Sequence, residues 1–277
     1  MQKGGTYEVI VFDDASVRTG DAPLSDRYDD RVRVLRAEKP VGAAQARNRL
    51  AECARGRILL YLDDDAFMCE KNTITRAYSA FEDHPEAGIL AFQVVDHVDG
   101  DVHQRVPFSW WRIWRGGEIV KKTNPVSTFL GGGYAIRQIV VEKTGGYEPF
   151  FHYMGEEQDL AFKTLEEGYT IQYVPRVSIA HKPGPPIENR AGEKSRLFYS
   201  VRNRIYLARR YIPTRYLPSY LLYWLSVYAG QAVTVNDKRG YVRGLYAGFS
   251  HWGDWTRAPL SASTQQYLRR YGRHLWF

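Results

Sequence analysis

The stretch RGRILLYLDDDAF, residues 55–67, joins an apolar run to three consecutive carboxylates. The run ILLYL has the length and composition of a buried strand, and Asp63, Asp64 and Asp65 follow it directly. Adjacent negative charges are costly to bury unless a cation or strong hydrogen bonds compensate them. Mg²⁺ and Mn²⁺ suit carboxylate ligands, often together with substrate phosphates. The stretch predicts a divalent metal site at a strand end, and a solvated acidic turn is the alternative.

Upstream of this stretch lie two more apolar runs with a helical segment after the second. YEVIVFDD (residues 7–14) also ends in acids, and RVRVLRAE (31–38) alternates with a period of two. VGAAQARNRLAECARG (41–56) has helical spacing that Gly56 stops. Strand, helix, strand with acids at the strand ends predicts a mostly parallel, Rossmann-like α/β sheet with its chemistry at the carboxyl edge.

The downstream sequence continues this alternation. Helices are expected in TITRAYSAFEDHPEAG (73–88), QIVVEKTGG (138–146) and GEEQDLAFKTLEEGY (155–169). Strands are expected in GILAFQVVDHV (88–98) and TIQYVPRVSIAH (170–181), the latter ending in a loop. Between them lie an irregular aromatic stretch, FSWWRIWRGG (108–117), and a glycine-rich turn, FLGGGYAIR (129–137).

Other acids and one histidine are candidates for chemistry, each with a structural alternative. Asp13 or Asp14 could accept hydrogen bonds from a base or a ribose, but an Asx turn or a helix cap explains them equally well. Glu156, Glu157 and Asp159 crowd three acids at a helix start, where the helix dipole favours them; one could instead be a general base. His181 closes a strand and could be a third metal ligand, although a lone histidine is more often structural.

The ordered set of these motifs, from about Tyr7 to His181, resembles glycosyltransferase family 2 with the GT-A fold. The resemblance implies inverting transfer of a hexosyl or deoxyhexosyl group from a nucleotide-diphosphate sugar to a hydroxyl of a saccharide, glycolipid or other acceptor. The resemblance also implies a role in polysaccharide or cell-envelope biosynthesis. It further implies a divalent metal, Mn²⁺ or Mg²⁺. Family members usually open with a strand and helix before the first acidic motif, whereas this sequence starts almost at the second strand.

The resemblance also assigns residues to roles. For catalysis it implies Glu157, with Glu156 and Asp159 as neighbouring candidates. For the metal it implies Asp65, Asp63 and His181. For the nucleotide sugar it implies a larger set: Asp13, Asp14, Arg47, Asn48, Asp63, Asp64 and the turn glycines Gly131, Gly132 and Gly133.

Size and composition fit one large domain, or one domain with an appendage. The chain has 277 residues, 44% of them hydrophobic and 25% charged. We expect a nucleotide-sugar-binding and catalytic domain over residues 1–189 and a basic, aromatic, helical C-terminal extension over 190–277. The uncharged stretch 216–236 is too diluted by polar residues for a convincing membrane span and predicts a buried or interfacial helix.

The cysteines, the N-terminal sequence and the basic C-terminal extension predict the location and the partners of the protein. Cys53 and Cys69 lack zinc or disulfide spacing, and the N-terminal sequence lacks an export pattern, so we expect reduced thiols and a cytoplasmic protein. The basic extension favours either a solvated face or peripheral contact with anionic lipid on the inner face of the membrane. Nucleic acid is not the expected partner, because the sheet edge is acidic.

Two alternatives to the transferase remain open. A non-catalytic or truncated homologue could act as a binding protein, which the short N-terminus favours. A sugar-phosphate nucleotidyltransferase would also pair acids with a metal, but the glycine-rich phosphate loop expected after its first strand is missing from the sequence.

Overall fold

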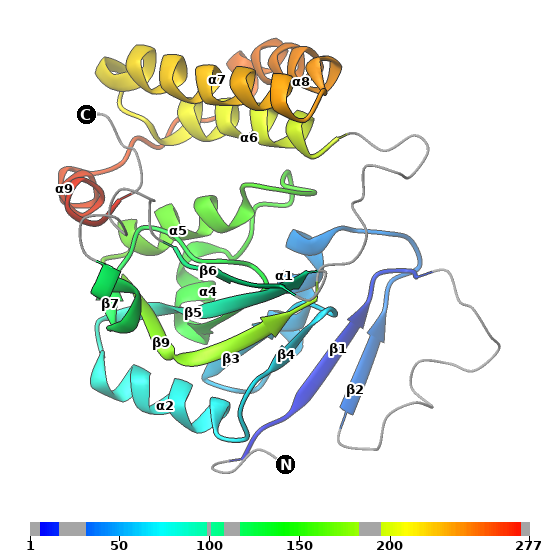
Figure 1. The fold of residues 1–277 in the computed structure, drawn as a ribbon, viewed down its shortest axis with the longest axis vertical. Coiled ribbons are helices and arrows are strands. Elements are labelled where there is room, and N and C mark those ends of the chain that lie inside the picture. The colour runs from blue at the N-terminus through cyan, green and yellow to red at the C-terminus, as the bar shows by residue number, and fades with distance from the viewer. Residues whose placement is uncertain (1–5, 17–31, 99–100, 108–116, 183–194, 273–277) are drawn as a thin grey trace.

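The computed structural model describes residues 6–16, 32–98, 101–107, 117–182 and 195–272. Most of the aromatic stretch FSWWRIWRGG and the segment 183–194 lie outside the described residues. Figure 1 shows a central sheet with helices on both sides and a layer of C-terminal helices, α6 to α8, stacked above it. The α/β architecture and the helical C-terminal region therefore agree with the sequence expectation.

The strands form two sheets within the described residues. β1 (Val9–Asp13) and β2 (Val32–Arg36) pair in parallel as a small sheet of their own. The larger sheet has the order β3-β8-β5-β9-β4, with β6 on β5 and β7 on β9. Its strands have the following bounds: β3 Ile58–Leu62, β4 Ala66–Met68, β5 Ala87–Val98, β6 Asp101–Arg105, β7 Asn124–Pro125, β8 Gly133–Arg137 and β9 Thr170–His181.

Strand directions are mixed rather than mostly parallel. Among the described pairings, β1–β2 and β5–β9 are parallel and the other five are antiparallel. The reason lies at β8, where Gly133 pairs with Leu62. The chain enters β8 beside the carboxyl end of β3, so β8 must run against β3 and also against β5.

Helices α1, α2, α4 and α5 occur where the sequence predicted helices, and four more, α6 to α9, form the described part of the C-terminal region. Their bounds are α1 Ala43–Cys53, α2 Thr73–Asp83, α4 Gln138–Thr144, α5 Glu156–Glu166, α6 Arg196–Tyr211, α7 Leu217–Thr234, α8 Lys238–Ser250 and α9 Ala262–Tyr271, with short 3-10 turns at Gly117–Lys121, Thr214–Tyr216 and Trp252–Asp254. Local sequence sets several starts: Ser195 caps α6, Asp237 caps α8 and Ser261 caps α9 through side-chain oxygens.

Two hydrophobic cores hold the layers together. One face of the sheet packs on α2 through Ala77, Ala80 and Phe81. The other face packs on α1, α4 and α5, and this core continues into α6 and α9 through residues such as Tyr206 and Leu268. α6 and α9 therefore share a core with the sheet, while α7 and α8 pack on α6 through two smaller clusters.

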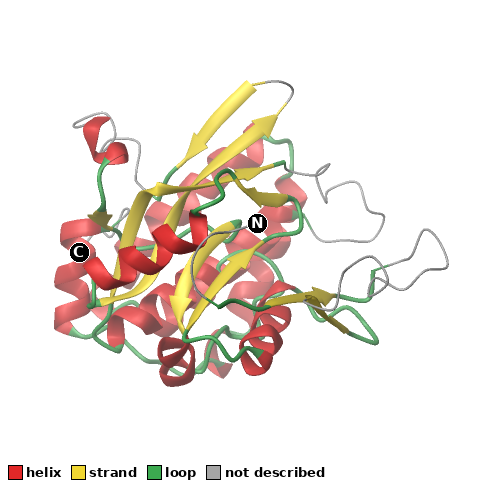
Figure 2. Ribbon diagram, turned by 90° about the horizontal axis from the view of Figure 1, so that it is seen from below, coloured by secondary structure: helices red, strands yellow, loops and turns green. Residues whose placement is uncertain are grey.

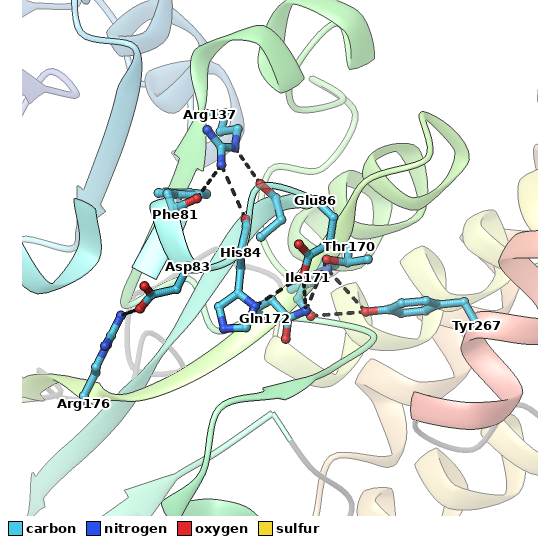
Figure 3. A network of polar contacts seen from close by, with 11 residues as sticks. Phe81, Asp83, His84, Glu86, Arg137, Thr170, Ile171, Gln172, Arg176 and Tyr267 are labelled. Atoms are coloured by element: carbon cyan, nitrogen blue, oxygen red, sulfur yellow. Dashed lines mark hydrogen bonds and ion pairs between the residues drawn. The ribbon is translucent and has the colours of Figure 1, made fainter. Parts of the chain in front are cut away.

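A polar network also fastens α2 and α9 to the sheet (Figure 3). Arg137 at the end of β8 donates to the carbonyl oxygens of Phe81 and Ala87, which satisfies acceptors at the end of α2 and the start of β5. The Tyr267 hydroxyl of α9 contacts the backbone of Ile171 in β9. Viewed from below in Figure 2, helices flank the strands on either side.

Candidate active site

Asp63, Asp65 and His181 meet at one edge of the large sheet. Asp63 and Asp65 lie in the turn between β3 and β4, and β4 pairs with β9 so that Ala66 is opposite His181. One carboxylate oxygen from each aspartate and one ring nitrogen of His181 all lie within 4.8 Å of one another. The structure thus brings together residues more than 100 positions apart that the sequence assigned to a metal.

His181 is held between two carboxylates. Its Nε2 lies 3.1 Å from Asp65 Oδ1, and its Nδ1 lies 2.9 Å from Asp96 Oδ1 in β5, the residue paired with His181 across the sheet. Both ring nitrogens therefore face a carboxylate oxygen, which can only accept a hydrogen bond. With a cation in the group, Nδ1 would keep the proton shared with Asp96 and Nε2 would bind the ion, as in the carboxylate–histidine–metal arrangement.

The donor set fits a divalent cation. Asp65 Oδ1 is buried and has no hydrogen-bond partner within the described chain, and it faces Nε2. Two oxygens and one imidazole nitrogen suit Mn²⁺ or Mg²⁺ with further positions left for substrate oxygens. A cation between Asp65 and His181 would satisfy both atoms at once.

Sequence reasoning missed Asp96. It sits near the end of β5, inside the run GILAFQVVDHV, and Arg105 of β6 lies 3.7 Å from its other oxygen. An acid within a mostly apolar strand was the only signal, and nothing in the linear sequence places it opposite His181.

Arg47 links the metal group to the acids of α5. The buried guanidinium of this α1 residue lies 2.9 Å from Asp63 Oδ1 and 3.6 Å from Glu156 Oε1. It also donates to the carbonyl oxygen of Gly131, at 3.4 Å. One arginine therefore connects the turn after β3, the glycine turn and the start of α5.

The pKa values of both glutamates at the start of α5 are raised. Burial, followed by the adjacent Glu157 charge, raises the pKa of the Glu156 carboxyl to about 8, while Arg47 acts in the opposite direction. Burial also raises the pKa of Glu157, again partly offset by Arg47. A carboxyl with a raised pKa is a stronger base once ionised, which suits proton abstraction.

The glycine turn touches both groups of acids. A Cβ at Gly131 would collide with the Glu157 carboxylate, and a Cβ at Gly132 would lie 3.8 Å from Asp63 and 3.6 Å from His181. Gly133 packs on Ile179 of β9, where a Cβ would lie 2.7 Å from that side chain. The turn thus spans the space between the base candidates and the metal group, and a Cβ would clash at Gly131 and Gly133.

Asp159 has different surroundings from the two glutamates. Its fully buried carboxylate lies 2.8 Å from Lys163 Nζ and accepts a hydrogen bond from the Tyr211 hydroxyl of α6 at 2.6 Å. These contacts place Asp159 in the packing between α5 and α6.

Asp13 and Asp14, the predicted nucleotide-binding residues after β1, have their carboxylates in hydrogen bonds or ion pairs within the protein. Asp13 is buried, pairs with Arg36 and accepts from the Ser16 N–H; that backbone hydrogen bond is the main reason its pKa is lowered. Asp14 accepts from two backbone N–H groups, of Val41 at 2.6 Å and of Gly42 at 2.9 Å.

Asn48 is hydrogen-bonded to the backbone, whereas Asp64 is exposed to solvent. Asn48 exchanges two hydrogen bonds, each of 2.8 Å, with the backbone of Tyr147, which joins α1 to the segment after α4. Asp64 is exposed between the two metal candidates. Nucleotide contact by either residue stays a prediction.

Comparison with known proteins finds similarity to glycosyltransferases. The family model described as Glycosyl transferase family 2 matches residues 1–145. Polypeptide N-acetylgalactosaminyltransferase 5 of Caenorhabditis elegans is 27% identical over 199 residues, which are 63% of this chain and 31% of that protein. N-acetylgalactosaminyltransferase 7 of Drosophila melanogaster is 24% identical over 201 residues, with 63% and 34% covered. The matched region spans about a third of the length of these relatives.

Solved structures share the fold. The crystal structure of GalNAc-T7 with UDP, GalNAc and Mn²⁺ superposes with a TM-score of 0.58 at 17% identity, covering 95% of this chain and 48% of that one. S. aureus TarS 1–349 in complex with UDP-GlcNAc gives 0.57 at 16% identity, covering 86% and 70%. This likeness identifies the fold as GT-A. Since the family model covers more than half of the sequence, the chain belongs to glycosyl transferase family 2.

Proposed function

We propose that the protein is a metal-dependent, inverting glycosyltransferase that moves a sugar from a nucleotide-diphosphate donor to an acceptor hydroxyl. The observation that carries this proposal is the glycine turn, which has Glu157 on one side and the Asp63, Asp65 and His181 group on the other. A base and a site for the leaving diphosphate are therefore neighbours. Family membership supports it, as do similar structures solved with UDP, GalNAc and Mn²⁺ or with UDP-GlcNAc.

The chemical step is a single displacement. The acceptor oxygen forms a bond to the anomeric carbon as the bond from that carbon to the diphosphate oxygen breaks, and the acceptor proton passes to the Glu157 carboxylate. A divalent ion held by Asp63, Asp65 and His181 would supply charge neutralisation for the departing diphosphate. Arg47 holds Asp63 and Glu156 in place through its two ion pairs. Asp159 serves the packing of α5 on α6 in this proposal.

The first test identifies the donor. Thermal shift with UDP-GalNAc, UDP-GlcNAc, GDP-mannose and the dTDP and CDP sugars, with and without Mn²⁺, should give stabilisation by one nucleotide that requires the metal. Measured transfer or hydrolysis of that donor would exclude a binding-only protein. The anomeric configuration of the product, read by NMR, would establish inversion, and retention would contradict the single displacement.

The base is tested by Glu157→Gln, with Glu167→Gln at the exposed other end of α5 as the matched control. Base catalysis is worth a factor of about 10² to 10⁴, so turnover should fall by that much while the donor dissociation constant changes little. Loss of donor binding in Glu157→Gln would contradict the role of base. Full activity of Glu157→Gln together with an inactive Glu156→Gln would move the role to Glu156.

The acceptor and the cell location are the broadest part of the proposal. We propose a saccharide or lipid-linked hydroxyl as acceptor, and peripheral membrane contact through residues 190–277. Within the described residues, no helix is both long and apolar enough to cross a bilayer.

A further inference from the structure

Large apolar side chains are exposed together on α7, α8 and the link between them. Six of the eleven exposed large hydrophobic residues of the described chain fall within residues 222–249. They are Leu222, Val233, Val235, Val242, Tyr246 and Phe249, with exposures from 45% to 77%. We call these six residues the outer patch. Single exposed apolar residues are ordinary on a protein surface, but a cluster of this kind marks an interaction site.

α7 has no charged residue on any face. From Leu217 to Thr234 the sequence lacks Asp, Glu, Lys and Arg. Tyr220, Tyr228 and Ala232 face the protein and are buried, while Leu222 and Val233 share the opposite, exposed side. A helix face that contacts only water normally carries charged side chains, so this face has the composition of one that contacts something apolar.

α8 has its small residues on one side and its large ones on the other. Gly240, Gly244 and Gly248 recur every four residues and pack on α6; a Cβ at Gly244 would lie 2.8 Å from Cβ of Val201. Because the glycines bring α8 close to α6, the large residues Val242 and Tyr246 project outward. Tyr246 is the most exposed of them, at 77%.

Positive charge borders the outer patch. Lys238, Arg239 and Arg243 are exposed on α8. Asp237 is the only acid between residues 217 and 250, and its carboxylate accepts a hydrogen bond from the Gly240 N–H at the start of the helix. Next to Tyr246, an open apolar hollow of about 440 Å³ is bordered by Arg243 and lined by Phe198, Val242, Tyr246 and Ala247.

The helices that carry the patch face away from the sheet. In Figure 1, α7 and α8 lie side by side at the top of the molecule, with α6 between them and the sheet layers. A flat partner could therefore cover the patch without contacting β1 or β2 at the lower end of the molecule (Figure 1). The surface is also separate from the candidate active site, so its role does not depend on the catalytic assignment.

We propose, as a refinement of the membrane contact included in the proposed function, that the outer patch docks the protein peripherally on a bilayer that contains anionic phospholipid. Apolar and aromatic side chains would enter the interfacial region while the three basic residues contact headgroup phosphates, which is how amphipathic helices bind in the plane of a membrane. A second copy of this chain fits less well, because a two-fold contact through the patch would bring both sets of basic residues into one interface.

The test is co-sedimentation of the full chain with phosphatidylcholine vesicles, with and without phosphatidylglycerol. The wild-type protein should pellet with the anionic vesicles, and less so as salt is raised. The double variant Val242→Ser, Tyr246→Ser should bind at least about tenfold more weakly, since both side chains enter the lipid in this proposal. Both residues are exposed, so the variant should keep the thermal unfolding temperature of the wild type.

Two matched controls sharpen the result. Tyr78→Ser, Ile139→Ser removes two exposed apolar residues from α2 and α4 and should bind as the wild type does. Arg239→Gln, Arg243→Gln should lose the preference for anionic vesicles and keep residual binding to them. Equal pelleting of the patch variant and the wild type would overturn the proposal, as would wild-type protein that binds neither vesicle. A dimer in light scattering that the patch variant abolishes would assign the surface to self-association instead.

Discussion

Two strand ends in this molecule look alike in sequence and differ in the structure. VIVFD is followed by Asp14, and ILLYL is followed by Asp63, Asp64 and Asp65. At the first end, the oxygens of Asp13 and Asp14 accept hydrogen bonds from Arg36 and from the backbone of Ser16, Val41 and Gly42. At the second, Asp65 faces His181 with a buried oxygen that no hydrogen bond satisfies in the described chain.

The difference teaches how to separate structural acids from functional ones. Backbone N–H groups and one arginine already compensate the carboxylates after β1, so they stabilise the fold whether or not a substrate is bound. Near the second strand end, Asp63, Asp65, Asp96, Glu156 and Glu157 are placed with two arginines, Arg47 and Arg105. The three aspartates alone outnumber the two arginines, and such an excess of carboxylates over cations is the condition for which a divalent cation is the natural partner.

The largest expected effect comes from the second strand end. Asp65→Asn should weaken Mn²⁺ binding by more than about 100-fold, a larger loss than that of an outer-shell change, and should abolish sugar transfer. Isothermal titration with Mn²⁺ measures it, and Asp64→Asn is the control. If Asp65→Asn bound Mn²⁺ normally and Asp14→Asn did not, the two strand ends would have the opposite roles.

A smaller loss is expected when the histidine is released from its second carboxylate. Asp96→Asn should weaken Mn²⁺ binding by about 10- to 100-fold, because the amide no longer fixes the Nδ1–H form of His181. Nitrogen NMR of the imidazole should report the altered tautomer independently of activity. Asp101→Asn, an exposed change in β6, is the matched control. An unchanged tautomer and an unchanged affinity would remove Asp96 from the site.

Substitution of Asp14, after the first strand, should lower the free energy of unfolding and leave Mn²⁺ affinity unchanged. Asp14→Ala leaves the N–H groups of Val41 and Gly42 without their acceptor, which should lower the free energy of unfolding by about 1–3 kcal/mol. Urea unfolding measures this loss, and Glu38→Ala nearby should have little effect. Mn²⁺ affinity should stay at the wild-type value. A loss of metal affinity without a loss of stability would contradict a structural role.

The smallest effect concerns pH and Glu156. Burial and the Glu157 charge raise its pKa to about 8 in the folded protein, against about 4.3 in an unfolded chain. Between these values the folded state holds a proton that the unfolded state releases, so this group's contribution to stability is lost as pH rises through that range.

Glu156→Gln removes this titration. The loss of unfolding free energy between about pH 5 and pH 8 should become smaller than in the wild type by more than about 1 kcal/mol. Denaturation at the two pH values measures it, with Glu167→Gln as the control. Parallel pH profiles for wild type and Glu156→Gln would indicate that the buried carboxyl titrates normally.

Much of the secondary structure could be predicted from short stretches of sequence. The periodicity of residues 41–56 and 73–88 predicted α1 and α2, and the apolar runs predicted β1, β2, β3, β5 and β9. These patterns reflect which side chains face a core, and that depends on neighbours a few positions away. The direction of β8 was not readable, because it depends on the edge at which the chain re-enters the sheet after the glycine turn.

In the C-terminal region, too, the sequence predicted a helix but not how it packs. The uncharged stretch 216–236 predicted a buried or interfacial helix, and α7 has one buried face. Which of its faces is exposed followed from packing on α6. Likewise Glu157 and Asp159 are two residues apart in sequence, yet one borders the glycine turn and the other packs against Tyr211.

By itself, then, the sequence determined the helices α1, α2, α4 and α5, the strands β1, β2, β3, β5 and β9, and the three acids that follow a buried strand. It also determined which residue types could hold a metal, since all of these are written in short stretches of chain. Only the tertiary structure decided that His181 lies between Asp65 and Asp96. It also decided that the Asp14 carboxylate accepts hydrogen bonds from backbone N–H groups. Those outcomes depend on strand register and helix packing, which bring together groups that are far apart along the chain.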